Sequence, residues 1–435
     1  MDDLDRLRKQ YFSLFPVYLI TLPEPQVLAS TDAQRYLVSK LLLLEDEGAL
    51  ESEGSTRRGG RQPEDGYRRN FWRKVVDRME IGLRESGDDE LEIDERFYDV
   101  LTDLMVSTLS SNSSSAEAGP SSAPKTSFRS FIYDSPSTHP LCTSNERGEE
   151  HGRGLRQEKV ITLLEEQIAI QGGTTGLRTW TAALHLAHHI LHNPDLVFTD
   201  PALSENGVVE LGAGTGFISI LLAQLGMGVI STDLGQDDES DGAGDHQDEE
   251  DAMIPHGVGA GAEIDRTDQT GHSQAQTPLA RLQYNVSLNT AHAMNSSSKI
   301  MVKSLDWTDA HLPLDQRPAI WRLLDEEKRT IVAADVIYDP DLVPPLVNTI
   351  NTLLSPNAGR SESVEGGRQA RQAIISATIR NQTTFDIFLH TCKQSHLVVT
   401  FMDLPRLDEE NPTFWDSALD KGTEVKVMRI TRMSS

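Results

Sequence analysis

The spacing of hydrophobic residues divides the chain into two regions. In the first hundred residues, apolar side chains recur at steps of three and four, the period of a helix. One such stripe lies near the start of the chain (Leu4, Leu7, Tyr11 and Leu14) and another near residue 100 (Phe97, Val100, Leu101, Leu104 and Met105). From residue 160 onward, short apolar runs rich in β-branched residues alternate with helical patterns. We therefore predict a small helical module followed by an α/β domain.

The second region predicts a mostly parallel sheet with helices on both faces, a Rossmann-like arrangement. The expected strands are residues 208–211, 228–232, 300–305, 330–336, 373–378, 397–401 and 424–430. The expected helices are residues 217–225, 278–290, 342–354 and 384–393. No clear helix separates the last two strands, so we expect them to pair antiparallel at the edge of the sheet.

Two intervals lack hydrophobic periodicity. The run 107–156 begins with nine serines between Ser107 and Ser127, buries too little apolar surface to order itself, and is predicted to be a linker. The run 235–277 has twelve acidic residues against one basic residue, and is predicted to be a disordered surface insert. The predicted organisation is a module at 1–106, a linker at 107–156 and a domain at 157–435 that carries the insert.

Composition narrows the class of partner. The formal net charge is −27, of which the insert supplies −11, and this excludes a general polyanion binder. The chain has no apolar run long enough to span a membrane and no secretory signal at its start, so we expect a cytoplasmic protein with no membrane contact. The two cysteines are far apart, which favours neither a disulfide framework nor structural zinc. A protein or small-molecule partner is expected, with no direct nucleic-acid binding.

The most informative motif is Val208-Val-Glu-Leu-Gly-Ala-Gly-Thr-Gly216, a predicted strand that ends in a glycine-rich turn before a helix. Glycines let the backbone turn tightly and approach a ligand closely, and the start of the helix offers unpaired N–H groups. Such a turn after the first strand of a sheet is typical of a nucleotide pocket.

A carboxylate follows at the spacing that this kind of pocket uses. Asp233 ends the next predicted strand, 21 residues after Gly212, where an acid binds ribose hydroxyls of either a dinucleotide or an adenosine. The glycine spacing differs from that of dinucleotide binders, and no hydride-transfer histidine or arginine is evident, which disfavours a dehydrogenase. An acid at Glu210, two residues before the first glycine, resembles motif I of S-adenosylmethionine-dependent methyltransferases.

Polar residues also follow two later strands. Asp306 and Trp307 end the third predicted strand and suit hydrogen bonding to, and packing against, an adenine. Asp335 and Tyr338 end the fourth, three residues apart. At the carboxyl ends of an open α/β sheet, such groups face the crevice where ligands bind.

Together these segments resemble a known family. Asp335-Val-Ile-Tyr338 is similar to the D-x-x-Y motif of the seven-strand protein lysine methyltransferases once called family 16. Gly173-Thr-Thr-Gly-Leu-Arg-Thr-Trp-Thr-Ala-Ala-Leu184 resembles that family's pre-motif. Together with the helical N-terminal module, the residues of this pre-motif are most similar to the branch of the family that methylates a lysine of translation elongation factor 2.

The resemblance implies a role for each matching residue. S-adenosylmethionine would lie across Gly212, Ala213 and Gly214, with the ribose on Asp233 and the adenine near Asp306 and Trp307. The methionine part would be bordered by Trp180, Glu210 and Ala334. We hypothesise that Asp335 and Tyr338 are the catalytic pair, which orients the substrate lysine nitrogen while its proton passes to water.

Other interpretations remain open. The same fold could act on another protein substrate, because the motifs define the donor better than the acceptor. A non-catalytic module that binds donor and partner without turnover is a third possibility. Four histidines at helical spacing (His185, His188, His189 and His192) lack a cysteine or paired carboxylate, so we expect no metal site.

Overall fold

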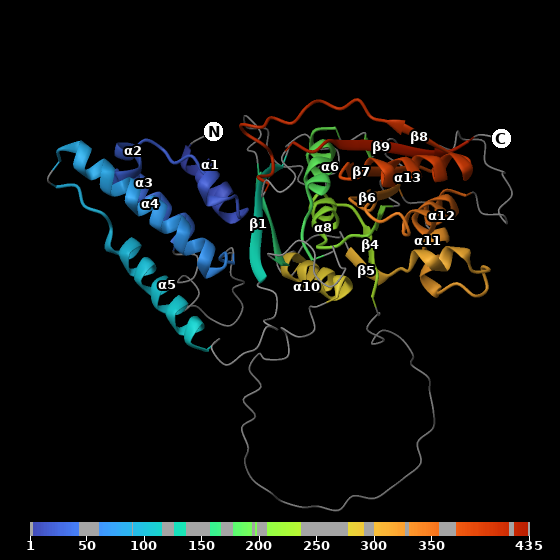
Figure 1. Ribbon diagram of the computed structural model, residues 1–435, viewed down its shortest axis with the longest axis horizontal. Coiled ribbons are helices and arrows are strands. Elements are labelled where there is room, and N and C mark those ends of the chain that lie inside the picture. Colours follow the sequence, from blue (N-terminus) through green and yellow to red (C-terminus); the bar gives the residue numbers. More distant parts are fainter. Residues whose placement is uncertain are drawn as a thin grey trace, which may run out of the picture.

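The computed structural model describes residues 3–42, 61–88, 90–114, 126–135, 157–166, 177–193, 196–197, 207–235, 277–290, 300–326, 330–355, 371–416 and 422–433. Most of the insert 235–277 and residues 173–176 of the pre-motif lie outside these ranges, as does part of the predicted linker. Figure 1 shows a helical module beside a larger domain built on a sheet.

The N-terminal module is helical, as predicted. Its elements are α1 (Asp3–Phe12), η1 (Val17–Leu19), α2 (Pro25–Ala29), α3 (Thr31–Leu37), η2 (Val38–Leu42), α4 (Asp65–Ser86) and α5 (Glu95–Ser114). The apolar stripes of α1, α4 and α5 face one another and form one core, which includes Leu7, Tyr11, Trp72 and Phe97. Burial of apolar area of this size is the main force that holds such short helices together.

The α/β domain contains a seven-stranded sheet in the order β5-β4-β3-β6-β7-β9-β8. Its strands are β3 (Val208–Leu211), β4 (Val229–Asp233), β5 (Ile300–Ser304), β6 (Thr330–Ala334), β7 (Ala373–Thr378), β8 (Leu397–Phe401) and β9 (Val425–Arg432). Strands β3 to β7 are parallel, whereas β9 is antiparallel to both β7 and β8. The antiparallel pairing predicted for the last two strands is therefore confirmed.

Helices cover both faces of this sheet, as predicted. One core includes residues of α6 (Thr181–His192), α8 (Phe217–Gln224) and α10 (Pro278–Thr290). The other includes residues of α11 (Ala319–Glu326), α12 (Val343–Leu354) and α13 (Gln382–Gln394). On β3, Val208 belongs to the first core and Val209 to the second, because successive side chains point to opposite faces.

A separate hairpin joins the module to the domain. Strands β1 (Thr126–Ser135) and β2 (Gln157–Glu166) pair antiparallel over ten residues each. Phe131 and Tyr133 of β1 lie in the domain core, whereas Ile132 between them lies in the module core. The interval predicted to be a linker therefore holds the end of α5 and all of β1, and the hairpin contacts both parts of the molecule (Figure 1).

Candidate functional site

The predicted site residues meet where the sheet order changes direction. Strand β3 lies between β4 and β6. The chain adds β4 and β5 on one side of β3 and then returns to add β6 and β7 on the other side. Ligands of open α/β sheets bind at the carboxyl ends of the strands at such a point. At this edge the glycine turn follows β3, Asp233 is the last residue of β4, and Asp335 follows β6.

The glycine turn is tightly built. Gly212, Gly214 and Gly216 all have positive φ, of 64°, 56° and 84°. A Cβ atom on Gly212 would lie 2.9 Å from Cγ1 of Val336, closer than real side chains approach, and 3.3 Å from the Trp307 ring, a tight contact. With no side chain at Gly212 or Gly214, the turn presents backbone at the edge of the sheet, which fits a donor laid across residues 212–214.

Asp233 is bonded to this turn. Its Oδ2 accepts the N–H of Gly214 at 2.6 Å, and its Oδ1 accepts the N–H of Leu234 at 2.8 Å. Burial raises the pKa of Asp233, and the two backbone bonds oppose that rise. The structure therefore brings Asp233 to the predicted donor pocket; its bond to ribose stays a prediction.

Glu210 lies deeper than the turn. Its side chain accepts a hydrogen bond from the hydroxyl of Ser219 on α8, and Ser219 in turn lies 2.7 Å from the hydroxyl of Ser231 on β4. Burial raises the pKa of Glu210 to about 8, so the carboxyl is mostly protonated at neutral pH. The contact that the structure shows is with α8, and a border with the methionine part remains a prediction.

The ring of Trp307 lies against the glycine turn, and Asp306 directly precedes it in the chain. Trp307 begins a short 3-10 helix, η6 (Trp307–His311), and its ring approaches Gly212 as described above. Asp306 caps this helix, with Oδ1 accepting the N–H of Thr308 at 2.8 Å and its hydroxyl at 2.7 Å. The cap fixes the backbone from which the indole projects over the glycine turn.

Asp335 is held rigidly at the end of β6, next to Ala334. Its backbone has φ of 54°, an uncommon conformation for a residue with a side chain. The carboxylate is 4% exposed and accepts the N–H and hydroxyl of Thr378, at 2.8 and 2.9 Å, and a guanidinium N–H of Arg380 at 3.2 Å. Tyr338, by contrast, is 42% exposed.

Arg380 joins Asp335 to Trp180. Its guanidinium carbon lies 4.5 Å from the centre of the Trp180 ring, a cation–π distance. Sequence reasoning missed Arg380 and Thr378, although Thr378 ends β7 and Arg380 follows two residues later. The rule that found Asp335 at the end of β6 applies equally to these residues.

The four histidines of α6 make other contacts. The rings of His188 and His192 stack with centres 4.2 Å apart, and Nδ1 of His188 lies 2.7 Å from the hydroxyl of Thr413. Burial lowers the pKa values of His188 and His189 to about 4. Among the described residues, no group of three or more histidine, cysteine or acidic side chains is arranged to hold a metal ion. Those residues also include no helix with the length and apolar character of a membrane span.

A seven-stranded sheet in this order, with a glycine turn after β3 and acids after β4 and β6, defines the class I methyltransferase fold. The sequence model of the lysine methyltransferase family matches residues 156–240 and 267–372, which together make up less than half of the chain.

Named relatives are similar to part of this chain at modest identity. Protein-lysine N-methyltransferase EFM3 of Chaetomium thermophilum is 28% identical over 62% of this chain and 62% of its own length. Methyltransferase-like protein 22 of Mus musculus is 28% identical over 45% and 39%. Human protein-lysine N-methyltransferase EEF2KMT is 25% identical over 52% and 53%. In each case the match spans less than two thirds of the relative.

Proposed function

We propose that the protein is an S-adenosylmethionine-dependent protein-lysine N-methyltransferase whose substrate is translation elongation factor 2. The observation that carries the reaction type is the meeting of the glycine turn, Asp233, Trp180 and Asp335 at one edge of the sheet. The names of the relatives support a protein lysine as acceptor. The resemblance of the pre-motif that ends at Leu184 supports elongation factor 2 as the substrate. Because that factor acts in translation, we also propose that this protein works in the cytoplasm.

The chain's residues would mainly hold the reactants and exclude water. When bound, S-adenosylmethionine supplies a methyl group on a sulfonium ion, which an unprotonated amine can attack in line. A lysine has a reference pKa of about 10.4, so it must lose its proton before it can react. Tyr338 is exposed enough to contact an incoming lysine, while Asp335 is fixed by Thr378 and Arg380. We assign Asp335 and Tyr338 the role of orienting the amine, and its proton passes to water. Orientation of this kind can lower the reaction barrier by several kcal/mol.

The first test combines activity with donor binding. Purified protein is incubated with labelled S-adenosylmethionine and purified elongation factor 2, and the labelled band is analysed by mass spectrometry. Label on a lysine, lost in Asp233→Ala, supports donor, reaction and substrate together. Label on a different protein of a whole extract would keep the reaction and reject the substrate; a relative named methyltransferase-like protein 22 makes this alternative concrete. Donor binding with no label anywhere would favour the non-catalytic module.

Variants of the proposed catalytic pair separate chemistry from folding. Tyr338→Phe removes one hydroxyl from an exposed ring, so we expect unchanged thermal unfolding and unchanged binding of S-adenosylhomocysteine. We expect kcat to fall by about tenfold or more, the size of a lost positioning contact. Asp335→Ala should lower both kcat and stability, because it releases Thr378 and Arg380. Full turnover in both variants, with donor bound, would show that the assignment is wrong.

A further inference from the structure

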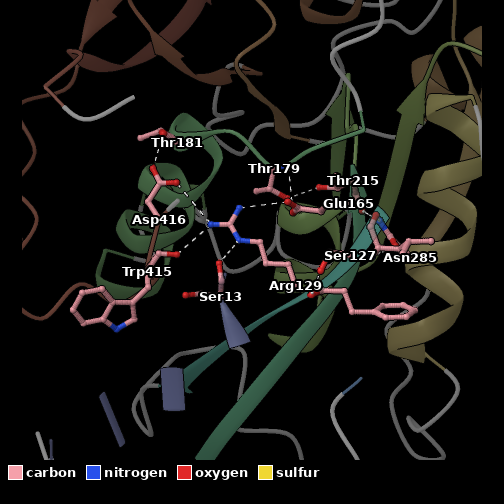
Figure 2. Close-up of polar contacts among 12 residues, drawn as sticks. Ser13, Ser127, Arg129, Glu165, Thr179, Thr181, Thr215, Asn285, Trp415 and Asp416 are labelled. Atoms are coloured by element: carbon pink, nitrogen blue, oxygen red, sulfur yellow. Dashed lines mark hydrogen bonds and ion pairs between the residues drawn. The ribbon is translucent and has the colours of Figure 1, made fainter. Parts of the chain in front are cut away.

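A buried arginine outside the predicted site connects the parts of the molecule. Arg129 of β1 has a side chain only 1% exposed. Its Nε donates to the carbonyl oxygen of Ser13 at 2.8 Å, and its Nη2 donates to that of Trp415 at 3.3 Å. Two carboxylates balance its charge: Glu165 at 3.4 Å and Asp416 at 3.8 Å (Figure 2). A charge so deeply buried is tolerated only with such partners.

The same two carboxylates hold both neighbours of Trp180. Oε1 of Glu165 accepts the N–H of Thr179 at 3.3 Å. Oδ2 of Asp416 accepts the hydroxyl of Thr181 at 2.6 Å. Arg129 thus contacts two carboxylates, one of which holds the backbone N–H before Trp180 and the other the side-chain hydroxyl after it, while Arg380 covers the indole itself.

Thr179 extends the network to the glycine turn. Its hydroxyl lies 2.6 Å from that of Thr215, the residue between Gly214 and Gly216. The carbonyl oxygen of Thr215 accepts a hydrogen bond from the side-chain amide of Asn285 on α10, at 3.0 Å. Figure 2 shows these contacts as one series from Ser13 through Arg129 to Thr215. The glycine turn is therefore held by polar contacts that begin in the helical module.

We infer that Arg129 is a positioning residue for the methyl-donor site. It acts through Glu165 and Asp416 on the segment 179–181 and on Thr215. Through Ser13 it also makes the position of the helical module part of the same network. The inference rests on the proposed function, because it takes the glycine turn as the donor site. Removal of the guanidinium should weaken donor binding more than it slows the chemical step.

The test uses the full chain and S-adenosylhomocysteine as the probe, with affinity measured by calorimetry. Arg129→Gln should raise Kd about tenfold, the usual size of coupling through such networks. The double variant Thr179→Val with Thr181→Val removes the Thr179–Thr215 and Thr181–Asp416 hydroxyl contacts and keeps the Glu165–Thr179 backbone bond, and it should raise Kd to a similar extent. Combined with Arg129→Gln, it should add little, since all three changes interrupt one network. In methyl-transfer assays, KM for the donor should rise while kcat at saturating donor stays within about twofold.

Arg371→Gln is the matched control. Arg371 is 14% exposed and donates to the carbonyl oxygen of Leu353 at 2.7 Å, near the start of β7 and away from the glycine turn. This variant should lose stability and keep the donor affinity of the unaltered chain.

The outcomes separate the two proposals. If the unaltered chain fails to bind S-adenosylhomocysteine, both the proposed function and this inference are overturned. If it binds, and the threonine double variant binds equally well, only the inference is overturned, even where Arg129→Gln does not fold. A Kd in the combined variant that is about a hundredfold raised would show independent effects and would also overturn it.

Discussion

At the scale of single residues, Gly212 shows how sequence and space combine. Its φ of 64° favours glycine, and Val336 and Trp307 leave no room for a Cβ atom. Gly87, at the end of α4, has φ of 63° and nothing within 4 Å of an added Cβ atom. A substitution there would therefore cost only the strain of the backbone conformation, without a steric clash. We expect Gly87→Ala to cost about 1 kcal/mol of unfolding free energy, and Gly212→Ala to cost about 2 to 4 kcal/mol.

Donor binding should separate these two glycines more sharply than stability. Gly212→Ala pushes on the ring and the valine that border the turn, so S-adenosylhomocysteine should bind at least about tenfold more weakly. Gly87→Ala should bind it normally, because Gly87 lies in the module. Denaturant unfolding and calorimetry on both variants provide the check. Equal losses in the two would mean that the space at Gly212 is unimportant.

Glu210 predicts a pH dependence of stability. Its pKa is about 8 in the folded protein and about 4.5 when exposed, so between these values the folded state holds a proton that the unfolded state has lost. Raising the pH through this range therefore destabilises the protein, by up to about 1.4 kcal/mol per pH unit from this group. Glu210→Gln should remove that dependence, so the variant gains stability relative to the unaltered chain from about pH 5 to pH 8. Urea unfolding at several pH values without donor measures it; parallel curves would contradict the assignment.

At the scale of elements, hydrophobic pattern was sufficient where an element is buried and regular. The predicted ranges for β3, β7, β8 and α10 agree with the structure, because each is a short apolar or amphipathic run with clear ends. Strand β1 was missed, since its ten residues include only four apolar ones (Phe128, Phe131, Ile132 and Tyr133) and lie in a serine-rich interval whose average composition is that of a linker.

The candidate site was predictable only in part, for the same physical reason. Glycines and acids at strand ends are local features, and the fold alone brings strand ends together. Arg129 has partners 36, 116 and 286 positions away, which no local pattern indicates. The positive φ of Asp335 likewise depends on its contacts with β7, and it directs the carboxylate toward Thr378 and Arg380.

At the scale of the whole molecule, the hairpin determines where the chain can be divided. Phe131 of β1 lies 4.8 Å from the ring of Phe217, and Tyr133 lies 5.5 Å from that of Phe414, measured between ring centres. Loss of one such core aromatic typically costs about 3 to 5 kcal/mol. We therefore propose that the domain includes β1, with its boundary before residue 126 in place of the boundary at 157 predicted from the sequence.

Two shortened chains test this boundary. Residues 157–435 lack both aromatics and the whole partner strand of β2, a loss comparable with the full stability of a domain, about 5 to 15 kcal/mol. We expect that chain to be insoluble or to unfold without a cooperative transition. Residues 126–435 should unfold cooperatively, because the core of the removed module is formed mostly by residues of the module itself and little by the domain.

The longer of the two chains also reports on the module's link to the donor site. Residues 126–435 keep Arg129, Glu165 and Asp416 but lack Ser13, whose carbonyl oxygen fixes Nε of the guanidinium. We expect S-adenosylhomocysteine to bind this chain about tenfold more weakly than the full chain, as for Arg129→Gln. Introducing Arg129→Gln into it should then change the affinity little. Undiminished affinity in residues 126–435 would show that the module does not act on the donor site. In the boundary test, cooperative unfolding of residues 157–435 would show that the domain folds without β1.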